Sequence, residues 1–405
     1  MENSTKKIIY SPGATLLVEN SLNEGYFYII QKGTVSVHCD IDFNDRTLLK
    51  HDAGDTYGLV SGLTQNPVRY TLVADTDCEV IRIPLNMLGS FLHKNREICL
   101  KIISLYSNQL RALNNYLVSK HPGSQDLENP KNLLNIAESY IKMKQYSIAA
   151  HCLSKYIEWA KDNQSEQHNI EKTKKLLNKI APDYRIPVAD TKILSLEKDY
   201  IIFAENEPAD YFYVIEEGAV KISKLVDGQE FILSILREGE IFGEMAILNK
   251  KVRNASAIVF EKSVVLRLSV DTFMDEIGEK IIQRLFTSFA RRIWYAHKRA
   301  SLVNMHNPNA RLYNYLQILI SDIKTMSKNK KTKGREYIFN FNLLDLKRMI
   351  GLTDINDESI NDFLTDDNIE ISNQCIRIID SRKIDDRALL YKSREGKTKI
   401  YELPT

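Results

Sequence analysis

The chain has 405 residues, of which 43% are hydrophobic and 27% charged, a composition that predicts ordinary globular domains and excludes a disordered or fibrous protein. Its 55 lysines and arginines nearly balance its 53 aspartates and glutamates, so no overall charge attracts nucleic acid or a membrane surface. No stretch reaches the roughly 18 to 20 apolar residues that span a bilayer, and the five cysteines lack the spacing of a metal site. We therefore expect a cytoplasmic protein with reduced thiols and no metal.

The first part of the chain has the pattern of a β domain followed by a long helix. Residues 10–84 contain short alternating apolar segments separated by glycine and proline, which is typical of antiparallel strands with tight turns. From Leu88 to Val118, apolar residues recur at three- and four-residue spacing, which predicts a helix. We assign residues 1–122 to a first domain.

A helical linker is predicted over residues 123–185. Two helical patterns are separated by a turn at Lys142–Gln145, and the small residues Ala137 and Ala149 allow the two helices to approach closely. This segment resembles a single tetratricopeptide unit, with Glu171–Ile180 as a candidate third helix. One such unit cannot bury its apolar face alone, so we expect it to pack on a neighbouring domain, as a spacer or as a partner-binding site.

The second domain, residues 186–302, repeats the first about 185 residues later in the chain. Residues 193–268 repeat the β pattern, and Val270–Leu302 repeat the helix. The most similar segments are Tyr26–Ile30 with Tyr211–Ile215, and Gly54–Gly58 with Gly239–Gly243. A repeat of this length predicts two folded domains, not the units of a solenoid.

The helix of the second domain carries a continuous apolar stripe. Its members are Ile282, Leu285, Phe289, Ile293, Ala296 and Ala300. Such a stripe on a long helix at a domain edge suits two-fold pairing with a second chain, so we expect a homodimer. Burial against the chain's own β domain is the alternative, and both can hold for different faces of the helix.

One difference between the repeats concerns their chemistry. In the second repeat, Glu244 directly follows Gly243, the last glycine of the glycine cluster Gly239–Gly243. In the first repeat, Leu59 directly follows the matching Gly58. A carboxylate accepts hydrogen bonds from a ligand, and an isobutyl group does not. Nine residues after Glu244 comes Arg253, whose guanidinium can offer two parallel donors to an anion. We expect the second repeat to bind a ligand and the first to have lost this ability.

The segment Gly239–Leu248, followed by Arg253-Asn254-Ala255, resembles the phosphate-binding cassette of cyclic-nucleotide-binding domains. The resemblance implies that Gly243 opens a short helix facing the phosphate, that Arg253 binds the phosphate, and that Glu244 accepts the ribose 2′-hydroxyl. The expected ligand is cAMP or cGMP, with no other cofactor. The expected site residues are Gly243, Glu244, Met245, Ala246, Arg253, Asn254 and Ala255. An ion pair between Glu244 and Arg253 in an empty β roll is the alternative.

Two departures from the family pattern leave parts of this prediction open. Asn254 stands where the family usually has Ser, Thr or Ala, and the base would be read from the long helix near Tyr295–His297, so the nucleotide is not identified. In the first repeat, Leu59 replaces the carboxylate and Tyr70 would crowd a phosphate at Arg69. We expect no ordinary cyclic nucleotide there, with a different small anion at Arg69 as the alternative.

From about Lys192 onward, the order of β roll, long helix and compact C-terminal unit resembles the catabolite-activator (Crp/Fnr) transcription regulators. In residues 303–405 the resemblance rests on Leu344–Leu352, which is similar to the first helix and turn glycine of a helix-turn-helix. Asp357–Leu364 would then be the recognition helix and residues 369–380 the wing. The resemblance implies a winged-helix domain that binds DNA.

The charge of the expected recognition segment argues against DNA. Residues 352–370 contain seven acidic side chains and no lysine or arginine, so they would repel phosphates and release no counterions. Basic tracts at Lys328–Arg335 and Lys392–Lys399 could still contact a backbone. Tandem domains also occur in kinase regulatory subunits, but no arginine-rich segment stands before the first domain.

The expected fold class is α+β multidomain, with two β-roll cyclic-nucleotide-binding domains and their long C-terminal helices, a tetratricopeptide-like helical linker, and a C-terminal winged helix. Two functions follow. The first is a cyclic-nucleotide receptor that regulates transcription through the winged helix. The alternative is a signalling or scaffold protein that does not bind DNA and engages a protein through its linker and acidic winged helix. The sequence contains no phosphate-binding loop, zinc-protease motif or nucleophile elbow, so we expect no enzyme.

Overall fold

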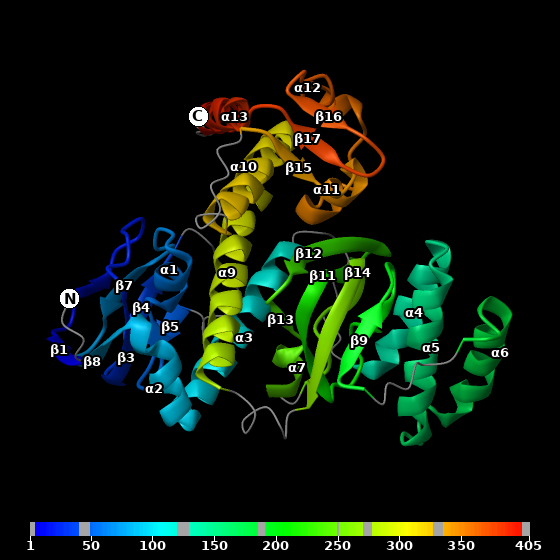
Figure 1. Cartoon of the computed structure of the whole chain (residues 1–405), viewed down its shortest axis with the longest axis horizontal. Helices are drawn as coiled ribbons and strands as arrows, with labels where there is room; N and C mark the ends of the chain where they lie inside the picture. Colours follow the sequence, from blue (N-terminus) through cyan, green and yellow to red (C-terminus); the bar gives the residue numbers. More distant parts are fainter. Residues whose placement is uncertain are drawn as a thin grey trace, which may run out of the picture. The chain divides into compact units, whose positions relative to one another are not determined.

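The computed structural model describes residues 5–39, 49–119, 129–184, 191–248, 251–269, 278–326 and 335–398 (Figure 1). The chain divides into two compact units. One comprises Met1–Asn115 with Pro122–Trp294, and the other Tyr116–His121 with Tyr295–Thr405. Among the described helices, none is both long and apolar enough to cross a membrane. Within the same residues, no group of three or more His, Cys, Asp or Glu side chains is arranged to hold a metal ion.

The first β domain consists of two four-stranded antiparallel sheets, with strand orders β1-β8-β3-β6 and β2-β7-β4-β5. The strands are β1 (Lys6–Tyr10), β2 (Thr15–Leu17), β3 (Tyr26–Lys32), β4 (Val35–His38), β5 (Lys50–His51), β6 (Thr56–Tyr57), β7 (Thr71–Ala74) and β8 (Cys78–Pro84). Alternate side chains of both sheets form one core, because successive residues of a strand face opposite sides. Its buried members are Ile30, Val35, Tyr57, Leu72, Ala74, Cys78 and Val80. Three helices accompany the sheets: α1 (Leu59–Thr64), α2 (Leu88–Lys94) and α3 (Arg96–Ser119).

The second β domain repeats this pattern around one six-stranded antiparallel sheet. Its strands are β9 (Ile193–Leu196), β10 (Ile201–Phe203), β11 (Tyr211–Val226), β12 (Gln229–Arg237), β13 (Ile241–Phe242) and β14 (Ser256–Ser269). Its helices are α7 (Glu244–Leu248) and α9 (Glu279–Val303). The registers match: Tyr28 pairs with Arg82 in the first domain, and Tyr213 pairs with Arg267 in the second, 185 residues later in each case. The duplication predicted from the sequence is therefore present in the strand pairing.

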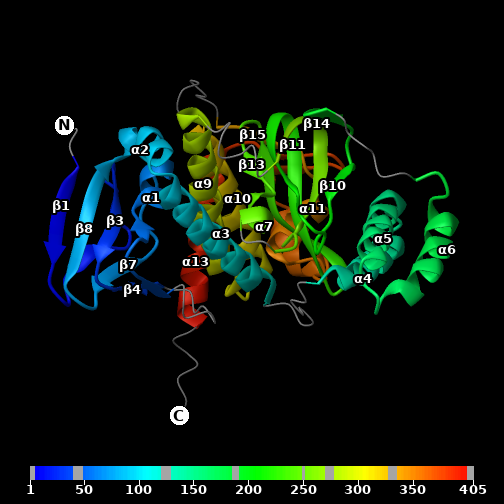
Figure 2. The same cartoon turned by 90° about the horizontal axis from the view of Figure 1, so that it is seen from below.

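The apolar stripe of α9 is buried within the single chain. All six of its members are at most 6% exposed. Part of the cover comes from α3, which lies beside α9 (Figure 2). The Tyr106 ring of α3 packs edge-on against Phe286 and Phe289, with centroids 6.2 and 6.4 Å apart. The stripe therefore no longer supports the predicted homodimer. The surface that was expected to pair with a second chain is already covered by other parts of the same chain.

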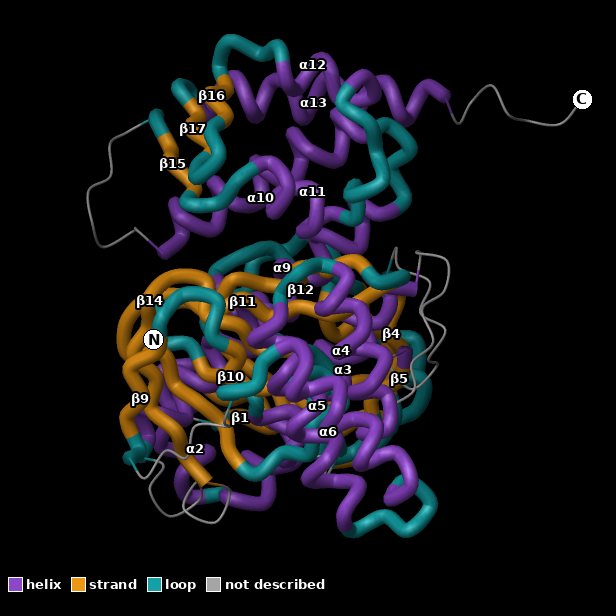
Figure 3. The backbone as a smooth tube through the Cα atoms, turned by 90° about the vertical axis from the view of Figure 1, so that its right-hand side faces the viewer, coloured by secondary structure: helices purple, strands orange, loops and turns teal. Residues whose placement is uncertain are grey.

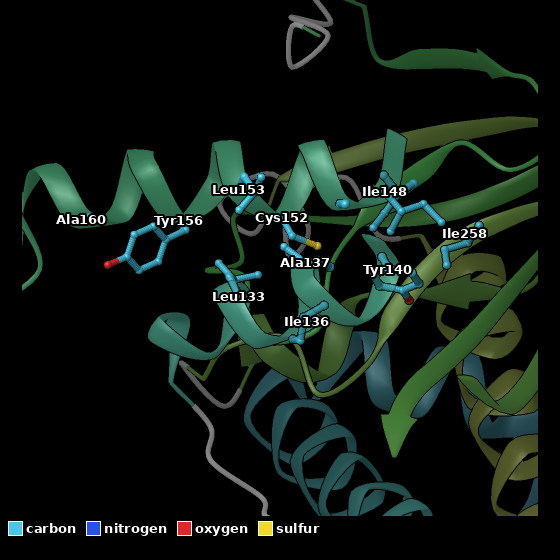
Figure 4. Packing of buried hydrophobic residues seen from close by; sticks show 13 residues of the cluster. Leu133, Ile136, Ala137, Tyr140, Ile148, Cys152, Leu153, Tyr156, Ala160 and Ile258 are labelled. Atoms are coloured by element: carbon cyan, nitrogen blue, oxygen red, sulfur yellow. The ribbon is translucent and has the colours of Figure 1, made fainter. Parts of the chain in front are cut away.

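The helical linker forms α4 (Leu133–Lys142), α5 (Tyr146–Lys161) and α6 (Ile170–Ile180). We call these three helices the helical module. The first two form a hairpin whose apolar face packs on the second β domain, as Figure 4 shows for Tyr140, Ile148 and Ile258. Ile201 and Ala204 complete the contact from the β10 side. The predicted packing on a neighbouring domain is confirmed, and the predicted turn falls between the end of α4 and the start of α5.

The C-terminal unit combines helices with a small antiparallel sheet of order β15-β17-β16 (Figure 3). Its elements are α10 (Pro308–Met326), β15 (Tyr337–Phe339), α11 (Leu343–Ile350), α12 (Asn361–Leu364), β16 (Ile369–Ile371), β17 (Ile376–Ile378) and α13 (Ser381–Thr398). Helix α11 begins with a capping box between Asn342 and Asp345 and ends at Gly351, whose φ of 66° is the left-handed cap that glycine favours. The basic tract at Lys328–Arg335 lies mostly outside the described residues.

The segment expected to be a recognition helix is helical over Glu358–Leu364, nearly its predicted extent, but it is irregular. Residues Asp357–Leu364 form a 3-10 turn, Glu358–Ile360, and the four-residue helix α12. Ile360 and Phe363 are fully buried, and the Asp362 carboxylate accepts the Tyr391 hydroxyl, so the segment is held tightly onto its own unit. A helical segment is therefore present where the recognition helix was expected, but only its last four residues are α-helical.

Candidate functional site

The candidate site is built around a glycine turn between β13 and α7. Gly243 has φ of +83°, a conformation that L side chains rarely adopt. A Cβ atom at this position would also lie 2.8 Å from Nη1 of Arg253 and 3.2 Å from the Phe203 ring. Glycine therefore serves two purposes: it lets the backbone turn, and it leaves room for the guanidinium of Arg253.

Arg253 lies directly against this turn and is only 4% exposed. Its Nη1 donates to the carbonyl of Gly243 and its Nη2 to the carbonyl of Tyr211, each at 2.6 Å. The guanidinium stacks 4.0 Å above the Phe203 ring, a cation–π contact. Burial lowers the pKa of Arg253 from its usual value. Since Gly243 directly precedes Glu244, the predicted arginine and carboxylate meet at one place.

Glu244 is held by an arginine that the sequence did not single out. Nη1 of Arg292, on α9, donates to Oε1 of Glu244 at 2.9 Å and to the Ile241 carbonyl at 3.3 Å. The side chains of Glu244 and Arg292 are 1% and 8% exposed, so this is a buried ion pair. The alternative in which Glu244 pairs with Arg253 is therefore not what the structure contains.

The neighbouring arginine makes a parallel contact, because Arg291 pairs with Glu240 of the glycine cluster at 3.3 Å. Two adjacent arginines of α9 thus reach the two carboxylates of the cassette. In the sequence, the only indication of these ion pairs is that two adjacent arginines, Arg291 and Arg292, interrupt the apolar stripe directly before Ile293. Tyr295–His297, where base reading was expected, belong to the second compact unit and are not placed relative to the cassette.

Several polar atoms of the cassette are buried without a hydrogen-bond partner. They are Oε2 of Glu244, Nε of Arg253 and both amide atoms of Asn254. Their residues are 1%, 4% and 8% exposed. Nearly all buried polar atoms in folded proteins have a partner, and each one left without costs about 1–3 kcal/mol. This concentration of unsatisfied donors and acceptors indicates a place where a polar ligand supplies the missing partners.

The other predicted site residues line the same place. Met245, Ala246 and Ala255 are all at most 8% exposed, and the Met245 sulfur contacts Nη2 of Arg292 at 3.8 Å. The predicted set is therefore brought together by α7 on one side and by the residues preceding β14 on the other.

The first β domain differs from the second more than its sequence suggested. In the second domain the main chain of Arg253 exchanges two hydrogen bonds with the turn at Asn206–Glu207, and in the first domain Val68 makes the matching pair. The bonds are Asn206 N to Arg253 O at 2.8 Å, Arg253 N to Glu207 O at 2.9 Å, Asn20 N to Val68 O at 2.9 Å and Val68 N to Ser21 O at 3.0 Å. Val68 therefore takes the place of Arg253, and Arg69 that of Asn254. The alignment of Arg69 with Arg253 is corrected by one residue.

Bulky side chains occupy the equivalent region of the first domain. Leu59 is fully buried, and Tyr106 of α3 is buried too, where desolvation raises the pKa of its hydroxyl well above the usual value. Burial also raises the pKa of Tyr70 to about 12. The first domain has thus lost the carboxylate and the arginine together.

A buried polar cluster joins the helical module to the turn behind Arg253. Nε2 of His151 lies 2.8 Å from Oε2 of Glu207, and Nζ of Lys155 lies 3.7 Å from Oε1. The main-chain N–H of Ala204 also donates to this carboxylate at 2.8 Å. Burial alone would raise the pKa of Glu207, but the charge and hydrogen bond of His151, with Lys155, hold it below its usual value. Through Glu207, the helical module therefore contacts the turn that hydrogen-bonds to the Arg253 main chain.

Comparison with known proteins agrees with this geometry. The family model of the cyclic nucleotide-binding domain matches residues 7–95 and 193–280. The chain therefore contains two domains that match the cyclic nucleotide-binding domain, as the resemblance predicted.

Among curated relatives, a CRP-like cAMP-activated global transcriptional regulator of Mycobacterium tuberculosis is 31% identical over 24% of this chain and 44% of its own length. A global nitrogen regulator of Nostoc is 26% identical over 34% of this chain and 61% of its own length. The cGMP-dependent protein kinase egl-4 of Caenorhabditis briggsae is 34% identical over 21% of this chain but only 12% of its own length. The chain thus spans less than two thirds of each of these relatives.

Proposed function

We propose that the second β domain binds a 3′,5′-cyclic nucleotide, cAMP or cGMP, and that the chain is a ligand-responsive regulator and not an enzyme. The unsatisfied buried atoms of Glu244, Arg253 and Asn254 carry this proposal. They place an acceptor, a cationic donor and an amide around one small region, which suits a sugar hydroxyl beside an anionic phosphate.

Binding requires an exchange of partners at Arg253. Its terminal nitrogens, now bonded to the carbonyls of Gly243 and Tyr211, would turn to the phosphate oxygens. Oε2 of Glu244 would accept the ribose 2′-hydroxyl while Oε1 keeps its bond to Arg292. Because Arg292 belongs to α9, occupancy of the site would change the contacts of the long helix. A shift of that helix is the proposed signal.

We propose the domain limits 1–122, 123–185, 186–302 and 303–405, with the last domain a winged helix that regulates transcription. The order α10, β15, α11, α12 and the hairpin β16–β17 supports this assignment. Several acidic residues of the unit serve internal contacts: Asp357 with Lys347, Asp362 with Tyr391, and Asp366 with Tyr313.

The second candidate is a signalling protein whose C-terminal unit engages a protein partner instead of DNA. It is favoured by the exposed acids on and around the helical segment Glu358–Leu364, among them Glu358, Asp367 and Glu370. Acids on a segment that would enter the major groove repel phosphates. The helical module is a further candidate surface for such a partner.

The test is calorimetric titration of the purified chain with cAMP and cGMP, alongside Arg253→Ala and Arg237→Ala. Arg237 is a matched control, since its side chain is 45% exposed and lies in the same domain. Saturable binding that Arg253→Ala weakens by about tenfold or more and Arg237→Ala preserves would support the proposal. Absence of binding to either nucleotide would overturn it.

A further inference from the structure

Helix α9 has no apolar surface left for a second chain. Its exposed side chains are Glu279, Lys280, Gln283, Arg284, Thr287 and Ser301, all of them polar. Every residue from Ser288 to Ala300 is at least partly buried, although only one chain is present. Helix α3 is enclosed in the same way, and Leu100 is its one exposed apolar residue among those whose side chains are described. Other parts of the same chain therefore already cover α3 and α9.

The cover on α9 comes from three separate elements of the first β domain. Near the start of α9, a Cβ atom at Gly89 of α2 would lie 2.9 Å from the Glu279 carbonyl oxygen. In the middle, Tyr106 of α3 contacts Phe286 and Phe289. Further along, the Trp294 indole donates to the Pro67 carbonyl at 3.1 Å.

These contacts extend along about 22 Å of helix, at 1.5 Å per residue. We call this set of contacts, in which Tyr106 is the α3 member, the α3–α9 seam. The two helices are counterparts, since each follows the β strands of its own repeat. A seam between equivalent helices is the arrangement of a two-fold dimer, but here both halves belong to one chain.

We propose that the first cyclic nucleotide-binding domain acts as a built-in second subunit, so that the receptor works as a single chain. This explains why the domain keeps its β core and its helix although Leu59 and Val68 have replaced the binding residues. Its role is to cover α9, not to bind a ligand. The homodimer expected from the sequence is replaced by an internal pair.

The seam also touches the binding site. Tyr106 packs on Phe289, and the guanidinium of Arg292 lies 5.9 Å from the centroid of that same ring. Arg292 in turn holds Glu244. The first domain thus supports the arginine that positions the ligand-binding carboxylate. A single chain also carries a single C-terminal unit, so a DNA site that it reads would need no two-fold symmetry.

The first test measures the mass of the intact protein by light scattering, with and without cAMP. The single-chain mass of 46.7 kDa is expected in both conditions, and a tagged copy should not retain an untagged copy during purification. A stable mass of about twice this value, or co-purification of the two copies, would overturn the proposal. The measurement without nucleotide is independent of whether the site binds a ligand.

The second test compares two adjacent residues of α9. Phe286→Glu places a charge in the seam, whereas Thr287→Glu places it on the exposed face. We expect the first variant to lose thermal stability and to self-associate through the uncovered stripe, while the second keeps the wild-type mass and melting temperature. Equal behaviour of the two variants, or a halved mass for Phe286→Glu, would contradict an internal seam.

Discussion

Arg292 is the residue on which the geometry of the site depends most. It balances a carboxylate that is almost completely buried, and its guanidinium lies on a helix outside the cassette. A buried charge is tolerated only when it is paired, because desolvation of a lone carboxylate is too costly. The pair Glu244–Arg292 therefore links the folding of the cassette to the placement of α9.

Replacing Arg292 with methionine should destabilise the protein. The variant keeps much of the side-chain volume but leaves Glu244 buried without its partner, which costs about 3–5 kcal/mol. Arg284→Met is the control, because Arg284 is exposed on the same helix and should change the free energy of unfolding by less than about 0.5 kcal/mol. Denaturant unfolding at neutral pH measures both. If Arg292→Met and Arg284→Met both changed the free energy of unfolding by similarly small amounts, Glu244 would have another partner or be uncharged. That result would contradict the role given to Arg292.

At the scale of elements, the helical module is more than a spacer. Its hairpin packs on β10 and β14, and His151 with Lys155 holds Glu207 beside the turn behind Arg253. The depressed pKa of Glu207 means that the folded protein favours the ionised carboxylate. This carboxylate therefore contributes stability above its ordinary value of 4.5, and the contribution is lost as pH falls through the lower, folded-state value.

Glu207→Gln should consequently destabilise the protein near neutral pH, with a smaller difference from wild type below about pH 4. Glu171→Gln is the control, since the Glu171 side chain is 75% exposed and its pair with Lys174 is worth little. Unfolding free energies measured across this pH range test the sign. A Glu207→Gln effect that grows on acidification would contradict the cluster as described.

Much of the fold could be predicted from the sequence, because strand alternation, the duplication and the hairpin with Ala137 and Ala149 are local patterns. The candidate site was harder to predict from the sequence. Arg69 resembles Arg253 in sequence, and only the main-chain bonds of Val68 reveal the shift of one residue. Arg292 was missed because its partner is 48 residues away in the chain. The 3-10 turn that opens the helical segment Glu358–Leu364 was not predicted either, because no local pattern separates it from α12.

At the scale of the whole molecule, the charge of the C-terminal unit decides between the two proposed outputs. The second candidate predicts weak binding to duplex DNA with a shallow dependence on salt, because exposed acids around α12 repel phosphates. Fluorescence anisotropy with a random duplex, with and without cAMP, measures this slope. A steep decrease of affinity with salt would instead indicate several phosphate contacts and would favour direct control of transcription.

The central claim is that each chain has one functional nucleotide-binding site, in the second β domain. Calorimetry with cAMP or cGMP should give one nucleotide per chain. Arg253→Ala should lower the affinity about 10- to 150-fold, the equivalent of one or two charged hydrogen bonds, while Arg69→Ala should leave it unchanged. Two nucleotides per chain, or equal losses from the two substitutions, would contradict the claim.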